Sequence, residues 1–293
     1  MSLSAAQLET YHQDGFIPRV ALVSPERAVS LGRRHGEFER ACLKHLGEVH
    51  WFKTYLLSRW IYELVTEPRL LDCMQSLLGP NLMLWGADMF YKPPRSERFT
   101  AMHQDSTYWG LEPVDGLVNA WIALARSTIA NGCLRVAPGT HRGGQVQHAN
   151  DFEEHNVLVH GQSAKGYSLQ EAVPVELEPG DMTLFHLHLV HGSGNNTTDK
   201  PRLGLAVRYI RPELRQTGLR DSALLVRGED NCGHFDHEQP PAGEFDSAAV
   251  AQFKDAIARP SGAGNSKGLE GLESQRVEAG HERVFPNVGV SAH

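Results

Sequence analysis

The sequence predicts a mostly β fold, a β-sandwich or barrel with helices packed against its outside. Up to about residue 79, apolar residues recur at helical spacing between helix start and stop signals. From there to about residue 215, short apolar strands follow one another with Gly and Pro turns between them. We therefore expect one domain over 1–293, with N-terminal helices at about 4–79, a β core at about 80–215 and an irregular C-terminal extension at about 216–293.

The composition is that of an ordinary soluble globular protein, with 41% hydrophobic and 22% charged residues. A net charge of −7 without a basic stripe argues against a nucleic-acid partner. No apolar run approaches the roughly 20 residues that span a bilayer, so no membrane association is expected. The four cysteines are far apart in the sequence and no signal peptide precedes them, which favours reduced thiols in the cytoplasm.

Start and stop signals place four helices in the N-terminal third. Ser4 and Gln7 form a capping box, Pro25 and Pro68 suit the first turn of a helix, and Gly79 ends the last one. The helices are expected at about residues 4–14, 25–46, 57–66 and 68–78.

The β core is expected to begin directly after these helices. Its strands are predicted at about residues 82–91, 101–105, 117–124, 133–136, 173–177, 182–191 and 201–210. Residues 148–171 are polar and contain glycine, so we expect a long loop there that could cover a site.

His103 and Asp105 are the first candidate site residues. Residues two apart project from the same face of a strand, so the imidazole and the carboxylate are expected side by side. They would form two thirds of a facial metal site, which needs a second histidine from a distant segment and leaves positions open for substrate and oxygen.

The segment 182–191 offers His186, His188 and His191 as that second histidine. Strand alternation puts His191 on one face and the other two on the opposite face, and the period alone does not decide which face points inward. Ser193 and Arg202 follow His191, and a guanidinium with a nearby hydroxyl can hold a carboxylate. The sequence therefore indicates a seat for a dicarboxylic cosubstrate beside a metal.

These motifs, taken in order, resemble the phytanoyl-CoA dioxygenase family over roughly residues 4–215. The motifs are His103-Gln-Asp105, Asn131-Gly-Cys-Leu-Arg-Val-Ala-Pro-Gly-Thr-His141, Glu178-Pro-Gly-Asp181 and His191-Gly-Ser-Gly followed by Pro201-Arg202. The resemblance implies a double-stranded β-helix (a cupin-like jelly roll) that uses Fe(II), 2-oxoglutarate and O2.

The resemblance also implies roles for individual residues. It assigns iron to His103, Asp105 and His191, and the 2-oxoglutarate carboxylate to Arg202 and Ser193. It further implies that Gln104 and Trp121 line the cosubstrate. A lysine that some members use near the start of the first core strand has no counterpart, because Asn81 stands there.

Asp105 also indicates the type of reaction. Related halogenases carry a small residue in place of this carboxylate, so its presence favours hydroxylation. A non-catalytic cupin-like protein that binds a metal or a dicarboxylate is the rival from another class. Such a protein could lose a triad member or Arg202, and this chain retains all four. A zinc hydrolase would need a general base, for which the sequence offers no candidate at matching spacing.

The substrate is indicated only by charged and aromatic residues near these motifs. Arg208 shares the face of Arg202 by strand period, and Asp88 interrupts an apolar strand. Tyr108 and Trp109 directly follow the metal motif. Several segments resemble a bacterial branch of the family that includes hydroxylases of 2-aminoethylphosphonate-type compounds.

A small zwitterion bound by Arg208 and Asp88 would fit that branch. A larger natural-product intermediate or an acyl thioester, bound in an apolar pocket under the loop at 148–171, is the alternative substrate. The sequence leaves the oligomeric state open.

Overall fold

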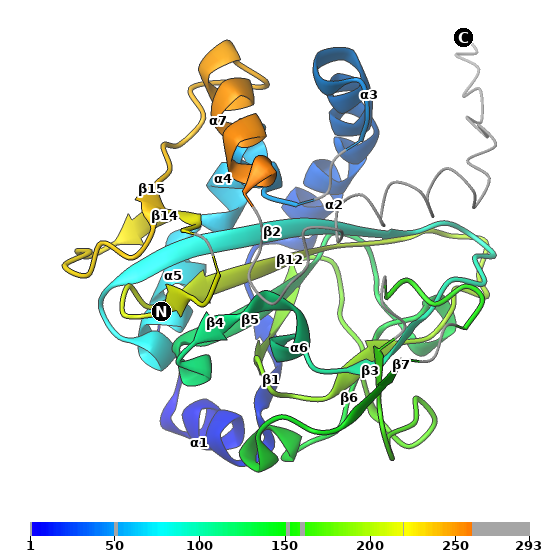
Figure 1. The fold of residues 1–293 in the computed structure, drawn as a ribbon. Coiled ribbons are helices and arrows are strands. Elements are labelled where there is room, and N and C mark those ends of the chain that lie inside the picture. The colour runs from blue at the N-terminus through cyan, green and yellow to red at the C-terminus, as the bar shows by residue number, and fades with distance from the viewer. Residues whose placement is uncertain (1, 50–51, 151–152, 159–161, 219, 260–293) are drawn as a thin grey trace, which may run out of the picture.

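The fold is a jelly roll of two facing β-sheets with helices packed outside, as predicted (Figure 1). The computed structural model describes residues 2–49, 52–150, 153–158, 162–218 and 220–259. The helices are α1 (Ala5–Asp14), α2 (Pro25–Arg33), α3 (His35–Leu46), α4 (Arg59–Val65), α5 (Pro68–Leu78), α6 (Ser106–Trp109) and α7 (Ser247–Ala258).

The larger sheet has the strand order β1-β10-β5-β12-β2-β14-β15, and the smaller one β3-β11-β6-β9. The larger sheet contains β1 (Phe16–Ala21), β10 (Asp181–His186), β5 (Leu117–Ala123), β12 (Arg202–Ile210), β2 (Leu82–Lys92), β14 (Ser222–Arg227) and β15 (Asp236–His237). The smaller contains β3 (Thr100–His103), β11 (His191–Ser193), β6 (Leu134–Val136) and β9 (Val173–Val175). Two separate hairpin-like pairs join β4 (Leu111–Glu112) to β13 (Arg215–Gln216) and β7 (His148–Asn150) to β8 (Gln162–Ala164).

The N-terminal helices lie close to their predicted ranges, apart from the one expected over 25–46, because their caps and apolar faces agree. The Ser4 side chain accepts a hydrogen bond from the Gln7 main chain, and the Gln7 side chain accepts one from the Ser4 main chain, which fixes the start of α1. Leu70 and Met74 on α5 are fully buried in the same cluster as Leu205 of β12. Burying each such side chain stabilises the fold by about 1.5–3 kcal/mol, so these helices cover one face of the larger sheet.

A second core lies between the two sheets. Trp121 of β5 and Phe185 of β10 meet Leu134 and Val136 of β6 there, together with Ala206 of β12. The inward face of the larger sheet is therefore apolar at this end, which leaves polar side chains on the same face conspicuous.

The segment predicted as one strand over 182–191 is divided between the two sheets. β10 ends at His186 and β11 begins at His191, so the expected alternation across the three histidines is wrong. Leu187, Leu189 and Val190 in the connection are all buried. A crossing segment that is buried along its length looks like a continuous strand in the sequence.

Three further boundaries differ from the sequence prediction. The helix expected over 25–46 is divided at Arg34 into α2 and α3. The loop expected over 148–171 contains the pair β7 and β8. The extension expected to be irregular forms β14, β15 and α7, and β14 pairs with β2 in the larger sheet. Among the described residues, none of the helices combines the length and apolar character that a membrane span requires.

Candidate metal centre and cosubstrate site

The two candidate histidines face each other because β3 and β11 are neighbours. His103 and His191 are cross-strand partners, and their ring centroids lie 4.3 Å apart. Asp105 Oδ1 lies 3.4 Å from His103 Nε2 and 3.7 Å from His191 Nε2. Ligands at right angles on one ion, each about 2.1 Å from it, would be about 3 Å apart. The three side chains could therefore hold one metal ion. Among the described residues, they are the one group of histidine, cysteine or acidic side chains close enough together to do so.

Asp105 reaches this position in a way that the sequence argument did not predict. β3 ends at His103, and Asp105 has helical dihedrals of φ −62° and ψ −31° at the start of α6. The two residues are therefore not on one strand face. The turn after the strand brings the carboxylate back beside the imidazole.

Main-chain carbonyls fix which nitrogen of each histidine faces the centre. His103 Nδ1 lies 2.9 Å from the Ala101 carbonyl, and His191 Nδ1 lies 2.9 Å from the Leu189 carbonyl. Because a carbonyl only accepts, each Nδ1 carries the proton and donates it, which leaves the Nε2 lone pair for a metal.

Burial keeps the free imidazole neutral at the centre. It lowers the pKa of His191 to about 4, with the charge of His103 adding to the effect. Burial alone would raise the pKa of Asp105, but the charge of His191 and the hydrogen bond from His103 keep it below its usual value. Neutral histidine and ionised carboxylate are the forms that bind a metal.

Asn119 holds the other oxygen of the Asp105 carboxylate. Its Nδ2 donates to Asp105 Oδ2 over 3.1 Å, and the residue is buried on β5. This leaves Oδ1 directed at the two histidines. The sequence analysis missed Asn119, for which the only signal is an amide within an otherwise apolar strand.

A cluster of two buried basic side chains lies beside β11, at the end of the larger sheet. Arg202 and Lys92 are cross-strand partners on β12 and β2, and both are buried. Lys92 Nζ donates to Ser193 Oγ over 2.8 Å and also contacts the Gly194 carbonyl. Arg202 lies with its guanidinium carbon 5.2 Å from the centre of the Trp121 ring. The predicted cosubstrate residues Arg202, Ser193 and Trp121 are thus brought together, with Lys92 added.

The described residues only partly satisfy the hydrogen-bond donors of Arg202 and Lys92. Arg202 Nη1 donates to the Gly132 carbonyl over 2.7 Å, whereas its buried Nε has no hydrogen-bond partner among the described residues. Burial, and then the charge of Arg202, lowers the pKa of Lys92 to about 6. Burial lowers the pKa of Arg202 to about 10. An anion is the ligand that would satisfy both groups.

Lys92 could have been found from the sequence by strand pairing. The prediction looked for a lysine at the start of the 82–91 strand, where Asn81 instead accepts a hydrogen bond from the Glu229 main chain. Antiparallel pairing of this strand with 201–210 places its far end, at Lys92, beside Arg202.

Gln104 lies between His103 and Asp105 in the sequence, and its side chain forms hydrogen bonds with the main chain. Its Nε2 donates to the carbonyls of Gly144 and His188 over 2.9 and 2.6 Å, and its Oε1 accepts from Val146 N over 2.8 Å. Both ends of the carboxamide therefore hold neighbouring segments together, and the cosubstrate-lining role of Gln104 stays a prediction.

Three of the four predicted substrate residues, Arg208, Asp88 and Trp109, lie in contact with one another. Arg208 and Asp88 form an ion pair with Nη1 and Oδ2 2.6 Å apart, and the Arg208 guanidinium lies 4.6 Å from the centre of the Trp109 ring. Arg208 and Asp88 were predicted to bind a substrate. In the structure they bind each other, so any substrate contact would involve the ion pair. Tyr108 lies in α6, but its side chain is outside the described part of the structure.

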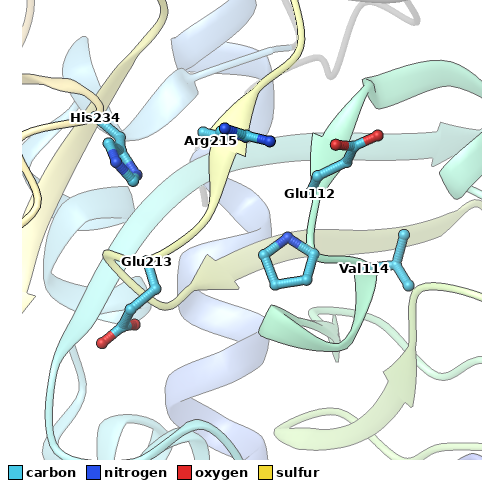
Figure 2. Close-up of a pocket in the computed structure, with 6 residues that line it drawn as sticks. Glu112, Val114, Glu213, Arg215 and His234 are labelled. Atoms are coloured by element: carbon cyan, nitrogen blue, oxygen red, sulfur yellow. The ribbon is translucent and has the colours of Figure 1, made fainter.

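The remaining histidines of the 182–191 segment lie outside the cluster. The Nδ1 of His186 accepts a hydrogen bond from the main chain of His188 over 3.0 Å. A separate surface pocket of about 500 Å³ lies beside β4 and β13, and Figure 2 shows its lining. That lining consists of Glu112, Pro113, Val114, Glu213, Arg215 and His234, and contains none of the residues predicted for the site.

Known proteins share both the sequence and the fold. A 161-residue stretch is 35% identical to a probable phytanoyl-CoA dioxygenase of Caenorhabditis elegans, and covers 53% of this chain and 52% of that protein. A 237-residue stretch is 29% identical to the peroxisomal phytanoyl-CoA dioxygenase of Bos taurus, and covers 71% and 68%. The matched region thus spans about half of the nematode protein and about two thirds of the bovine one.

Solved structures match over more of the chain. The non-heme monooxygenase ThoJ in its apo form has a TM-score of 0.78 and 32% identity, over 92% of this chain and 98% of that one. The protein CytC3 with Fe(II) and α-ketoglutarate (2-oxoglutarate) has a TM-score of 0.62 at 22% identity, over 84% and 96%, which shows a common fold.

A sequence profile of the phytanoyl-CoA dioxygenase family matches residues 11–204, more than half of the chain. The match contains the segments of β3, α6 and β11 that supply the three clustered side chains, and it extends to Arg202. The chain therefore belongs to the phytanoyl-CoA dioxygenase family of iron(II)/2-oxoglutarate-dependent oxygenases.

Proposed function

We propose that this chain hydroxylates a C–H bond of a small polar molecule. The reaction takes O2 and 2-oxoglutarate, inserts one oxygen atom into the substrate, and places the other in succinate as CO2 is released. The observation that carries the proposal is the cluster of His103, Asp105 and His191 beside two buried basic side chains that the described residues only partly satisfy. The 32% identical relative, which is described as a non-heme monooxygenase, supports the transfer of one oxygen atom.

The proposed iron ligands are His103 Nε2, His191 Nε2 and Asp105 Oδ1. Two imidazoles and one carboxylate are the set that binds iron(II) in oxygenases of this type and leaves positions open. The bound iron would supply the activation of O2. The protein's part is to hold the three ligands, through the carbonyls behind each imidazole and Asn119 behind the carboxylate.

The proposed 2-oxoglutarate site uses Arg202, Ser193 and Lys92 for the distal carboxylate. Arg202 Nε is buried with no partner in the described part of the chain, and Lys92 and Ser193 form a hydrogen-bonded pair beside it. A guanidinium can bind a carboxylate through two parallel hydrogen bonds. Trp121 packs against the Arg202 guanidinium and shields it from water, which strengthens those bonds.

The substrate side of the proposal is a phosphonate of the 2-aminoethylphosphonate type. Its support is the resemblance of several segments to the bacterial branch that oxidises such compounds, together with the buried charge of Arg208. A cytoplasmic location fits the cysteines, because none of Cys42, Cys73, Cys133 and Cys232 forms a disulfide bond.

Purified protein with Fe(II), ascorbate and 2-oxoglutarate tests the reaction class. We expect a charge-transfer absorption band on anaerobic addition of 2-oxoglutarate, and iron-dependent succinate release in air. Adding 2-aminoethylphosphonate should raise succinate release and give a product heavier by one oxygen atom, measured by mass spectrometry.

The Asp105→Ala variant is the matched negative, with Asp115→Ala as a control because Asp115 is an exposed carboxylate in an ion pair with Arg211. Loss of the band and of succinate in D105A alone supports the site. The reaction class is wrong if wild-type protein shows neither signal.

A further inference from the structure

Arg208 is a buried arginine whose Nε has no hydrogen-bond acceptor among the described residues. The residue is 7% exposed, its Nη1 is bound to Asp88, and its Nε is buried with no partner in the described part of the chain. A guanidinium carries five N–H donors, and leaving a buried donor unpaired is unfavourable. The free edge therefore calls for an acceptor from outside the chain.

This edge lies on the metal side of the larger sheet. Arg208 is the cross-strand partner of Asn119, and Asn119 donates to Asp105. An acceptor on Arg208 would thus lie next to the proposed metal ligands.

That acceptor is not the distal carboxylate of 2-oxoglutarate. Arg202 and Arg208 are six residues apart on the same strand, which separates their Cα atoms by about 20 Å at 3.3 Å per residue. A five-carbon dicarboxylate bound at Arg202 cannot place its distal carboxylate there. The two arginines would serve two different ligands.

Asp88 and Trp109 occupy two sides of the Arg208 guanidinium. Asp88 Oδ2 is already bound to Arg208 Nη1, and the Trp109 ring covers the guanidinium at 4.6 Å. An amine approaching Asp88 would meet the positive charge of Arg208 at the same place. An oxyanion can instead accept from the remaining nitrogens, side-on, as carboxylates and phosphates do.

We propose that the free Nε edge of Arg208 binds an oxyanion group of the substrate, a carboxylate or a phosphonate, and that Asp88 is a positioning residue for Arg208. This inference rests on the proposed function and changes one part of it. The acidic group of the substrate, and not its amine, is what the site recognises. The carbon to be oxidised then lies a short distance from the oxyanion, toward the metal ligands.

The experiment measures the binding of three probes to anaerobic protein loaded with Fe(II) and 2-oxoglutarate, by isothermal titration calorimetry. Ethylphosphonate and 2-aminoethylphosphonate differ only by the amine, and propionate replaces the phosphonate by a carboxylate. The proteins are wild type, R208K, R208Q, D88N and the control R126Q, whose arginine forms an exposed ion pair with Glu178. Circular dichroism and melting temperature show whether each variant is folded.

We expect wild type to bind the two phosphonates with affinities within about threefold of each other. The amine of 2-aminoethylphosphonate would add at most an exposed ion pair, which contributes little. R208Q should weaken both by about tenfold or more, since two charge-assisted hydrogen bonds are lost. R208K keeps the charge beside Asp88 but lacks the side-on edge, so it should lose affinity too, and it serves if R208Q does not fold. D88N should change both phosphonates by the same factor, and R126Q should change neither. The preference between propionate and ethylphosphonate identifies which oxyanion the site takes.

Three results would overturn the inference. They are no binding of any probe to wild type, affinities unchanged in folded R208K and R208Q, or a D88N variant that weakens only the amine-bearing probe. Succinate release separates this from the proposed reaction. Wild type that releases succinate without Arg208-dependent binding defeats only the inference, whereas Arg208-dependent binding without succinate defeats only the proposed reaction.

Discussion

Lys92 lies directly opposite Arg202 across the β2–β12 pair, so two basic side chains are buried side by side. Burial, and then the charge of Arg202, disfavours the charged form of Lys92 and lowers its pKa from 10.5 to about 6. A bound dianion would reverse this, because an opposite charge favours the protonated amine.

The first prediction concerns pH and Lys92. Between pH 6 and 10.5 the unfolded chain binds a proton at Lys92 that the ligand-free folded protein does not bind. Stability should therefore rise with pH across this window. We expect K92M without metal or 2-oxoglutarate to melt above wild type near pH 7, and the difference to shrink toward pH 10. K200M is the control, because Lys200 is exposed.

The same residue predicts proton uptake on binding 2-oxoglutarate. The cosubstrate should raise the pKa of Lys92, so wild type should take up a proton at pH 8. Titration calorimetry in two buffers with different ionisation enthalpies measures that proton. Identical heats in both buffers for wild type, or the same proton uptake in K92M, would contradict a role for Lys92 in this site.

The second prediction concerns Asn119. Removing its hydrogen bond to Asp105 Oδ2 should let the carboxylate rotate away from the two histidines. Loss of such a supporting group typically weakens metal binding by about 10- to 100-fold. We expect that loss for N119A in a cobalt(II) titration followed by absorption. A dissociation constant within about twofold of wild type would show that Asn119 does not orient the ligand.

The third prediction concerns Gln104. The Q104A variant should lose the hydrogen bonds to Gly144, Val146 and His188, at a cost of about 1–3 kcal/mol in the free energy of unfolding for a buried network. Hydrogen exchange at the Val146 amide should accelerate. Q104E should not restore it fully, because a carboxylate would face the two carbonyl oxygens. If Q104A raises only the KM for 2-oxoglutarate and leaves exchange at Val146 unchanged, Gln104 instead contacts the cosubstrate.

The fourth prediction concerns the buried pair of Lys53 and Glu238. Lys53 Nζ lies 2.6 Å from Glu238 Oε1, and Tyr55 and Ser222 also donate to this carboxylate. K53M would leave a buried carboxylate without its cation and should destabilise the protein by about 3–5 kcal/mol. Chemical denaturation measures this.

The K53M/E238Q double variant should recover part of that loss, since the unpaired charge is gone. The exposed pair of Arg59 and Glu63 is the control, and R59M should cost at most about 1 kcal/mol. Equal losses in K53M and R59M would mean that the buried pair has no special weight.

The sequence identifies the site residues better than it predicts their geometry. His103, Asp105 and His191 can be selected by residue type and order, and the structure brings them together. The reason first given, two residues on one strand face, does not hold, because β3 ends at His103. Turn conformations depend on packing that a single sequence does not display.

The sequence does not reveal residues that reach the candidate site only because two strands pair. Nothing within residues 82–92 marks Lys92 as a site residue until β12 is placed beside β2. Asn119 likewise becomes meaningful only when β5 lies behind the start of α6. The crossing between β10 and β11 was missed for a related reason, since Leu187, Leu189 and Val190 are buried throughout and show no period.

The pairing of β14 with β2 has a consequence for where this domain can end. The family profile stops at residue 204, and the β core was predicted to stop near 215, but Leu224 of β14 lies beside Leu84 of β2. A chain cut at 215 would expose the hydrogen-bonding edge of a long apolar strand, which is a site for aggregation. The cut would also remove Glu238, whose carboxylate pairs with the buried Lys53. The segment from β14 to α7 thus acts as a protective border for the sheet that carries Arg202 and Arg208.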